Sequence, residues 1–156
     1  MALREIIKDG DPTLRKVSRP VTVFDDRLGS ILDDMYETME AADGIGIAAP
    51  QVSLLRRIVV IDLGDETGRI ELINPEIVSQ SGSQKSQEGC LSCPNRWGYV
   101  NRPSKVKVKA QDRHGEEFII EGEDRLACCL CHEIDHLNGE LFVDKVTEWI
   151  KTNEDE

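Results

Sequence analysis

Residues 126–139 read LACCLCHEIDHLNG and contain the only pair of histidines in the chain at helical spacing. Apolar residues recur in this stretch about one helical turn apart, and Asn138-Gly139 is a typical helix stop. His132 and His136 are four residues apart, so a helix would project both imidazoles from one face. The sequence therefore predicts a helix with a paired-histidine face, around which the rest of the chain is organised.

The residue after the first histidine, Glu133, indicates that this pair could bind a metal. His132-Glu133-Ile134-Asp135-His136 has the His-Glu-x-x-His pattern. In this pattern two neutral imidazoles hold a divalent metal and the glutamate transfers protons. Two histidines at this spacing also occur as buried structural residues that hydrogen-bond to backbone. A catalytic metal site needs three protein ligands and one open position, so a third ligand has to decide between the two interpretations.

Length and composition indicate an ordinary globular protein. A chain of 156 residues is long enough for one core, so we expect residues 1–156 to form a single domain. Hydrophobic residues make up 39% and charged residues 31%, and no apolar run approaches the ~20 residues that cross a bilayer. The N-terminal residues lack the pattern of a signal peptide, so a cytoplasmic location is expected.

The net charge of −11 limits the partners that the chain can have. A strongly acidic protein is repelled by phosphate backbones and anionic membrane surfaces, so we expect no direct binding of nucleic acid or membrane. We also expect a monomer, although no sequence pattern bears on the oligomeric state. Contact with an RNA-rich assembly would need a local basic patch. The acidic residues 153–156 are expected to be frayed.

The cysteine count argues against a disulfide framework. The chain has five cysteines, an odd number, and no export signal. Cys128 and Cys129 are interpreted as small apolar residues of the core. Cys90 and Cys93 lie in Glu88-Gly89-Cys90-Leu91-Ser92-Cys93-Pro94 and allow three interpretations. A redox dithiol is disfavoured because Pro94 does not continue a helix, whereas a third ligand at Cys90 and a closed zinc site with Cys93 both stay open.

Local patterns predict an α+β fold of mostly antiparallel sheets packed around the histidine helix. The predicted helices are a turn after Asp11-Pro12 and an amphipathic helix from Asp25 to about Ala42. The predicted strands are 57–63, 70–79 with an interruption at Pro75, a hairpin of 105–111 with 118–120, and 140–146, before an amphipathic tail around Trp149.

Residues 44–51, GIGIAAPQ, interrupt the helical pattern with small side chains. A dinucleotide-binding loop would need a strand before the glycines and a helix after them, whereas here a predicted helix precedes them and Pro50 follows. We interpret the segment as a tight loop that another backbone can approach closely.

Three of these segments together resemble bacterial peptide deformylases. They are Gly44–Gln51, Glu88–Ser92 and His132–His136, which occur in the family's order and approximate separations within a match from Leu3 to about Val146. The resemblance implies a single catalytic domain that removes the formyl group from N-formylmethionine of nascent polypeptides. It implies metal ligands Cys90, His132 and His136, with ferrous iron as the usual ion and zinc, nickel or cobalt as substitutes.

The resemblance also implies roles for other residues. Glu133 takes the proton of the attacking water and passes it to the departing amine. The Gln51 amide and the Leu91 backbone N–H bind the oxyanion. The substrate pairs as an added strand along Gly44 and Gly46. The methionine pocket and its surroundings comprise Ile45, Gly89, Leu126, Cys129 and His132.

The chain departs from the family pattern at two cysteines. Cys131 stands where glutamine is common, and Cys93 where an aliphatic residue is usual. We predict that Cys93 makes the site sensitive to oxidation by forming a disulfide with Cys90. Arg125 predicts a preference for acidic substrates, and the acidic tail predicts only a transient ribosome encounter. A metalloprotease or a structural zinc-binding module are the alternative functions.

Overall fold

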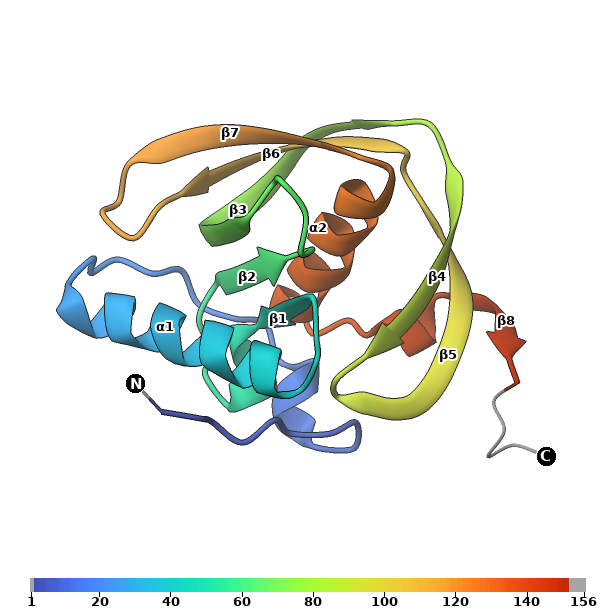
Figure 1. Cartoon of the computed structure of the whole chain (residues 1–156), viewed down its shortest axis with the longest axis horizontal. Helices are drawn as coiled ribbons and strands as arrows, with labels where there is room; N and C mark the ends of the chain where they lie inside the picture. The colour runs from blue at the N-terminus through green and yellow to red at the C-terminus, as the bar shows by residue number, and fades with distance from the viewer. Residues whose placement is uncertain (1, 152–156) are drawn as a thin grey trace.

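The computed structural model describes residues 2–151, which form two helices and two antiparallel sheets (Figure 1). The larger sheet has the order β1-β2-β3-β6-β7 and the smaller one the order β4-β5-β8. The larger sheet consists of β1 (Gly46–Ala48), β2 (Ile58–Asp62), β3 (Arg69–Ser81), β6 (Lys105–Gln111) and β7 (Glu117–Glu123). The smaller sheet consists of β4 (Gln84–Cys90), β5 (Cys93–Arg102) and β8 (Val146–Ile150). The predicted α+β class and antiparallel pairing are confirmed.

The predicted histidine helix is α2 (Asp124–Leu137), which contacts strands of both sheets. Its apolar face belongs to the main core, where Leu130 and Leu137 are fully buried in the cluster that also contains Leu72 of β3. Each such leucine contributes roughly 1.5–3 kcal/mol through burial. Figure 1 shows the helix running beneath β6 and β7, with β4 and β5 to its right. The fold thus holds the histidine face of α2 against the smaller sheet.

The predicted amphipathic helix is α1 (Asp26–Ala41). Asp25 caps it, because its side chain accepts a hydrogen bond from the Leu28 N–H at 3.1 Å. Leu32, Met35 and Met39 are completely buried in a second core cluster that includes β2. The turn predicted after Asp11-Pro12 is a short 3-10 helix, η1 (Pro12–Arg15).

Sequence patterns did not indicate the strands of the smaller sheet, nor β1, which with η2 (Ala49–Val52) lies where a tight loop was predicted. β4 and β5 form a hairpin around Leu91 and Ser92, in a region that the sequence describes only as polar. Ser86 and Glu88 are the buried residues of β4, so the strand lacks the apolar alternation by which strands are recognised. Its buried face is polar because it faces the site described below.

Two strand predictions were wrong in detail. Pro75 does not interrupt β3, because a register shift between Ile73 and Glu76 and the positive φ of Asn74 accommodate it. Residues 140–146 contain a 3-10 helix, η3 (Phe142–Asp144), and the strand follows as β8, where a tail was predicted. The acidic residues 153–156 lie outside the described residues. No helix within residues 2–151 is long and apolar enough to cross a membrane.

Candidate metal centre

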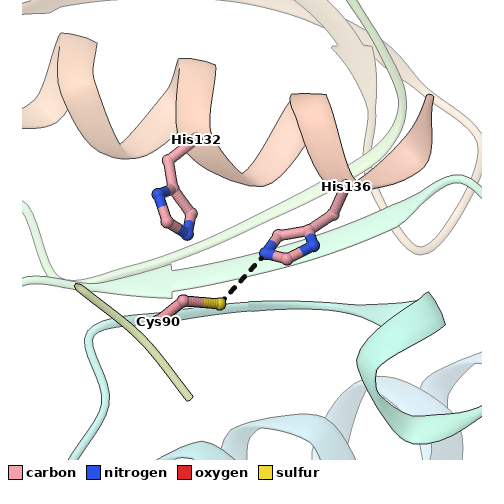
Figure 2. Close-up of side chains that lie close together, drawn as sticks. All are labelled: Cys90, His132 and His136. Atoms are coloured by element: carbon pink, nitrogen blue, oxygen red, sulfur yellow. Dashed lines mark hydrogen bonds between the residues drawn. The ribbon is translucent and has the colours of Figure 1, made fainter. Parts of the chain in front are cut away.

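Three potential metal ligands meet between α2 and the end of β4. The donor atoms of Cys90, His132 and His136 all lie within 4.8 Å of one another, and Cys90 Sγ is 3.4 Å from His136 Nε2. Figure 2 shows both imidazoles projecting from one side of the helix towards the Cys90 sulfur. The helical spacing therefore brings the two imidazoles together as the sequence predicts, and the end of β4 supplies the third group.

The donor set fits a divalent transition metal with one open position. A thiolate and two imidazoles are ligands that such ions prefer, and separations below 4.8 Å allow all three to reach one ion. Glu88 lies 2.9 Å from His132 Nδ1, so the other ring nitrogen, Nε2, is the one left for a metal. Within residues 2–151 the group contains no fourth donor, and Cys93 does not belong to it. This speaks against a closed four-ligand zinc site.

A buried chain of charges holds His132 in place. Arg102 donates two hydrogen bonds of 2.8 Å to Glu88, one to each carboxylate oxygen, and a third of 2.7 Å to Asp135. The Arg102 side chain is only 4% exposed and that of Glu88 only 7%. Burial alone would raise the pKa of Glu88, but the hydrogen bonds from Arg102 and His132 outweigh it and lower the pKa to about 2. Glu88 therefore stays ionised and accepts the Nδ1–H of His132.

Glu133 occupies the open side of the cluster. Its Oε2 lies 4.0 Å from His132 Nε2, and its Oε1 has no hydrogen-bond partner within the described residues. Burial raises the pKa of Glu133 to about 7, although His132 opposes the shift. A Cβ atom at Gly46 would come within 2.6 Å of Glu133 Oε2, so the glycine makes room for the carboxylate. A carboxyl group whose pKa is close to neutral pH can both accept and return a proton.

Gln51 is a fixed hydrogen-bond donor beside Cys90. It lies on η2 (Ala49–Val52) and is 1% exposed. Its Oε1 accepts the Ala48 N–H at 2.9 Å, which orients the amide so that Nε2 donates to Ser92 Oγ at 3.1 Å. The same Nε2 lies 3.6 Å from Cys90 Sγ. The predicted oxyanion donor is thus held rigidly next to the cluster.

The cluster opens into a cleft of about 850 Å³. Its walls include most of the predicted site residues, namely Gly44, Ile45, Gly46, Gln51, Gly89, Cys90, Leu91, Cys129, His132 and Glu133. Leu126 is not part of the lining and packs against the main core instead. β1 forms one wall and is an edge strand, paired within residues 2–151 only with β2. An extended peptide could therefore add to β1 as a further strand.

Sequence reasoning did not find all the residues of the site. Arg102 and Trp97 were missed. A Cβ at Gly89 would lie 2.7 Å from the Trp97 ring, which packs over the glycine in the cleft. Neither residue belongs to a motif, and the contacts depend on the β4–β5 pairing. The one available signal for the Arg102 network was the position of Glu88 and Asp135 beside two metal-ligand candidates.

The chain is similar to peptide deformylases along almost all of its length. The family model described as polypeptide deformylase matches residues 3–152. The peptide deformylase of Acetivibrio thermocellus is 57% identical over 154 residues, which are 99% of this chain and 89% of the relative. That of Caldicellulosiruptor bescii is 58% identical over 154 residues, or 99% and 92% of the two chains.

Solved structures agree with the sequence comparisons. A peptide deformylase from Legionella pneumophila has a TM-score of 0.90 at 49% identity, with 93% of this chain and 86% of the other covered. A Synechococcus elongatus peptide deformylase, solved in complex with actinonin, has a TM-score of 0.88 at 40% identity, with 97% and 81% covered. The similarity covers the cleft and all three cluster residues.

Proposed function

The chain belongs to the polypeptide deformylase family, and from that premise we propose how its residues perform the family's reaction. It hydrolyses the formyl amide at the N-terminus of nascent polypeptides and releases formate. The observation that carries the residue assignments is the cluster of Cys90, His132 and His136, which faces both a buried carboxylate and a fixed amide donor. We further propose that residues 1–156 act as one catalytic domain.

The metal ligands in this proposal are Cys90, His132 and His136. A divalent cation bound there would polarise the formyl oxygen and lower the pKa of a water molecule. We propose ferrous iron as the ion, as in the resemblance above, with zinc, nickel or cobalt as substitutes. Zinc binds such ligands more tightly than ferrous iron, so metal availability decides occupancy. Glu88 supports the assignment, because its contact with His132 Nδ1 orients the ring.

Glu133 is the proposed general base and acid. It takes a proton from the attacking water and returns it to the amine that leaves as the C–N bond breaks. Its burial and its place beside His132 Nε2 support this role. The Gln51 Nε2–H and the Leu91 backbone N–H bind the developing oxyanion. The contact of Gln51 Oε1 with the Ala48 N–H supports the assignment, since it fixes the donor before substrate arrives.

The substrate is proposed to lie along the edge of β1. Gly44 and Gly46 let its backbone approach, and a Cβ at Gly44 would collide with Leu91 at 2.7 Å. The methionine side chain enters the apolar part of the cleft at Ile45 and Cys129, where Gly89 also lines the wall. We propose that the enzyme is a cytoplasmic monomer that meets nascent chains by transient encounters at the ribosome, because its substrates arise there.

The proposal is tested by anaerobic measurement of formate release from formyl-Met-Ala-Ser. The native chain should release formate, whereas Glu133→Ala should keep its metal and lose the activity. Cys90→Ser should lose both metal and activity. A metalloprotease would keep its metal in Cys90→Ser and cleave internal peptide bonds, and a structural zinc-binding module would release no formate. Either result would contradict the proposed assignments.

A further inference from the structure

A second cavity lies at the other end of α1 from the catalytic cleft. It has a volume of about 790 Å³ and includes Arg27 and Leu28 of the first helical turn. The cleft is lined by Ala42 and Asp43, just beyond the last turn of the same helix. Ile31 is the last α1 residue in the cavity lining and lies 11 residues before Ala42, or roughly 16 Å along the helix axis. The two linings come closer near η2, where Gln51 lines the cleft and Ser53 lines the second cavity. In Figure 1 the cavity end is the blue end of α1, far from the β4–β5 hairpin. The two cavities share no lining residue.

Three arginines line this second cavity. Arg19 and Arg56 form a parallel backbone bridge, and Arg27 reaches the cavity from α1. None of the three forms an ion pair within residues 2–151, although the chain carries a net charge of −11. Arg69, by contrast, is exposed but paired with Glu40 at 2.6 Å. All three arginines are exposed, and Arg56 Nη1 donates a hydrogen bond to the Leu55 carbonyl at 3.3 Å. In so acidic a chain, three arginines without a carboxylate partner among the described residues, all around one cavity, are a local reversal of charge.

The rest of the cavity lining is mostly apolar. Val21, Leu28 and Ile58 are buried residues of its wall, and Val23 is 64% exposed at its edge. Asp25 is the one carboxylate in the lining, and its Oδ1 already accepts the Leu28 N–H as the helix cap. The arginines are therefore left to bind a charge supplied from outside.

We propose that this cavity is a binding site for a small organic anion with an apolar body and a carboxylate or phosphate head. Guanidinium groups form paired hydrogen bonds with both head groups. The apolar wall would bury the body of the ligand, as in other pockets of this size. This site is independent of formyl hydrolysis, because none of its residues belongs to the metal cluster or the cleft.

The test measures binding of the anionic fluorophore 8-anilinonaphthalene-1-sulfonate to the metal-loaded enzyme. Decanoate and decyl phosphate should displace the dye, whereas decanol, with the same tail and no charge, should not. The triple variant Arg19→Gln/Arg27→Gln/Arg56→Gln should bind decanoate about tenfold more weakly or worse, the effect of losing at least one charge-assisted pair. Its formate release and its melting temperature should match those of the native chain.

A matched control removes the same number of charges elsewhere. Lys105→Gln/Lys107→Gln/Lys109→Gln lies on β6 and should leave decanoate binding unchanged. Equal weakening by both triple variants would overturn the proposal in favour of a bulk charge effect. Displacement of the dye by formyl-Met-Ala-Ser but not by decanoate would show that the dye binds in the catalytic cleft, and it would contradict the proposed anion site. Displacement only by anionic vesicles or polyuridylate would assign the arginines to a membrane or an RNA backbone instead. The single variant Arg27→Gln should show a smaller loss in the same direction.

Discussion

Two groups of oppositely charged side chains in this enzyme have similar chemistry and very different surroundings. On the outer hairpin, three lysines of β6 face three glutamates of β7 at 3.4–3.6 Å, and every one of these side chains is at least 44% exposed. Beside the metal cluster, Arg102 contacts Glu88 at 2.8 Å with both side chains under 10% exposed. The first group is a solvated surface, and the second adjoins the proposed catalytic site.

The difference shows what burial does to an ion pair. Exposed pairs contribute about 0–1 kcal/mol each, because water and salt screen them. Removing one partner of a buried pair costs about 3–5 kcal/mol, since it leaves a charge without solvent or a counter-charge. Replacing both by apolar residues can be neutral, so the buried pair is not explained by stability alone. Its use here is to keep Glu88 ionised and His132 oriented.

Glu133 sharpens the comparison, because it is a buried carboxylate that receives no hydrogen bond from an arginine. Glu133→Gln should lower formate release by about 10³-fold, since the variant cannot accept the proton of the attacking water. The change should not destabilise the fold, because Gln removes a buried ionisable group whose pKa is about 7. Kinetics, metal analysis and thermal melting of the same preparation would check both expectations. A variant that loses stability as well as activity would mean that Glu133 is structural.

Arg102→Met tests the buried pair directly. The variant removes both Arg102 hydrogen bonds to Glu88 and the one to Asp135, and within residues 2–151 it leaves these carboxylates only the contacts with His132 and Lys145. The free energy of unfolding should therefore fall by about 3 kcal/mol. Metal affinity should fall about 10- to 100-fold, because His132 loses its fixed orientation. Urea unfolding and metal titration would measure the two effects. The matched control is Arg113→Met, whose partners Glu71 and Asp33 lie away from the cluster. Equal metal loss in both variants would break the comparison.

Local sequence patterns were sufficient for the histidine helix and not for this network. His132 and His136 are four residues apart, which is about one helical turn, so elementary helix geometry places them together. Arg102 is 14 residues from Glu88 and 33 from Asp135, and its contacts exist only because β4 and β5 pair. The buried residues of β4 are polar, and those of β5 are Cys93, Gly98, Val100 and Arg102. Neither strand has a regular apolar alternation, so neither was predicted.

The third metal ligand is an intermediate case. The residues alone disfavour a redox pair and leave Cys90 open between a catalytic ligand and a closed zinc site, and the family resemblance favours the catalytic ligand. The structure places Cys90 at the end of β4 facing α2, a position that depends on how the two sheets wrap the helix. The position of the last strand was predicted wrongly for a similar reason. β8 exists because it pairs with β5, whereas residues 140–146 carry the stronger local strand pattern.

The acid limb of the stability curve should report the Glu88 ion pair. The pKa of Glu88 is lowered to about 2 in the folded chain, against 4.5 as its ordinary value. Its ionisation therefore stabilises the fold at and above pH 4.5, and the contribution is lost as the pH falls towards 2. For the metal-free chain we expect a loss of about 2–3 kcal/mol over this window. Glu88→Gln should lack this part of the slope in urea unfolding at stepped pH. An unchanged slope would show that Glu88 is not the group responsible.

The site also holds two neighbouring cysteines, Cys90 and Cys93, which face each other across the two-residue turn. Peroxide can oxidise the two thiols to a disulfide with formation of two molecules of water, which would remove the metal ligand. Cys93→Val should therefore slow inactivation by hydrogen peroxide by about threefold, and thiol reductant should restore only the native chain. Cys131→Val, another buried cysteine, is the control. Equal rates for native chain and Cys93→Val would exclude this route.

The smallest effect is expected on the outer hairpin. Lys107 lies 3.4 Å from Glu121, with side chains 44% and 72% exposed. Lys107→Gln should change the free energy of unfolding by less than about 1 kcal/mol and leave metal binding and formate release unchanged. A double-mutant cycle with Glu121→Gln should give a coupling of about 0.2–1 kcal/mol that disappears in 1 M salt, where the screening length is only ~3 Å. Arg102 and Glu88 should keep their coupling in the same salt, because water and ions do not reach them. A salt-resistant coupling on the hairpin would mean that exposure does not separate the two groups, and the contrast between them would fail.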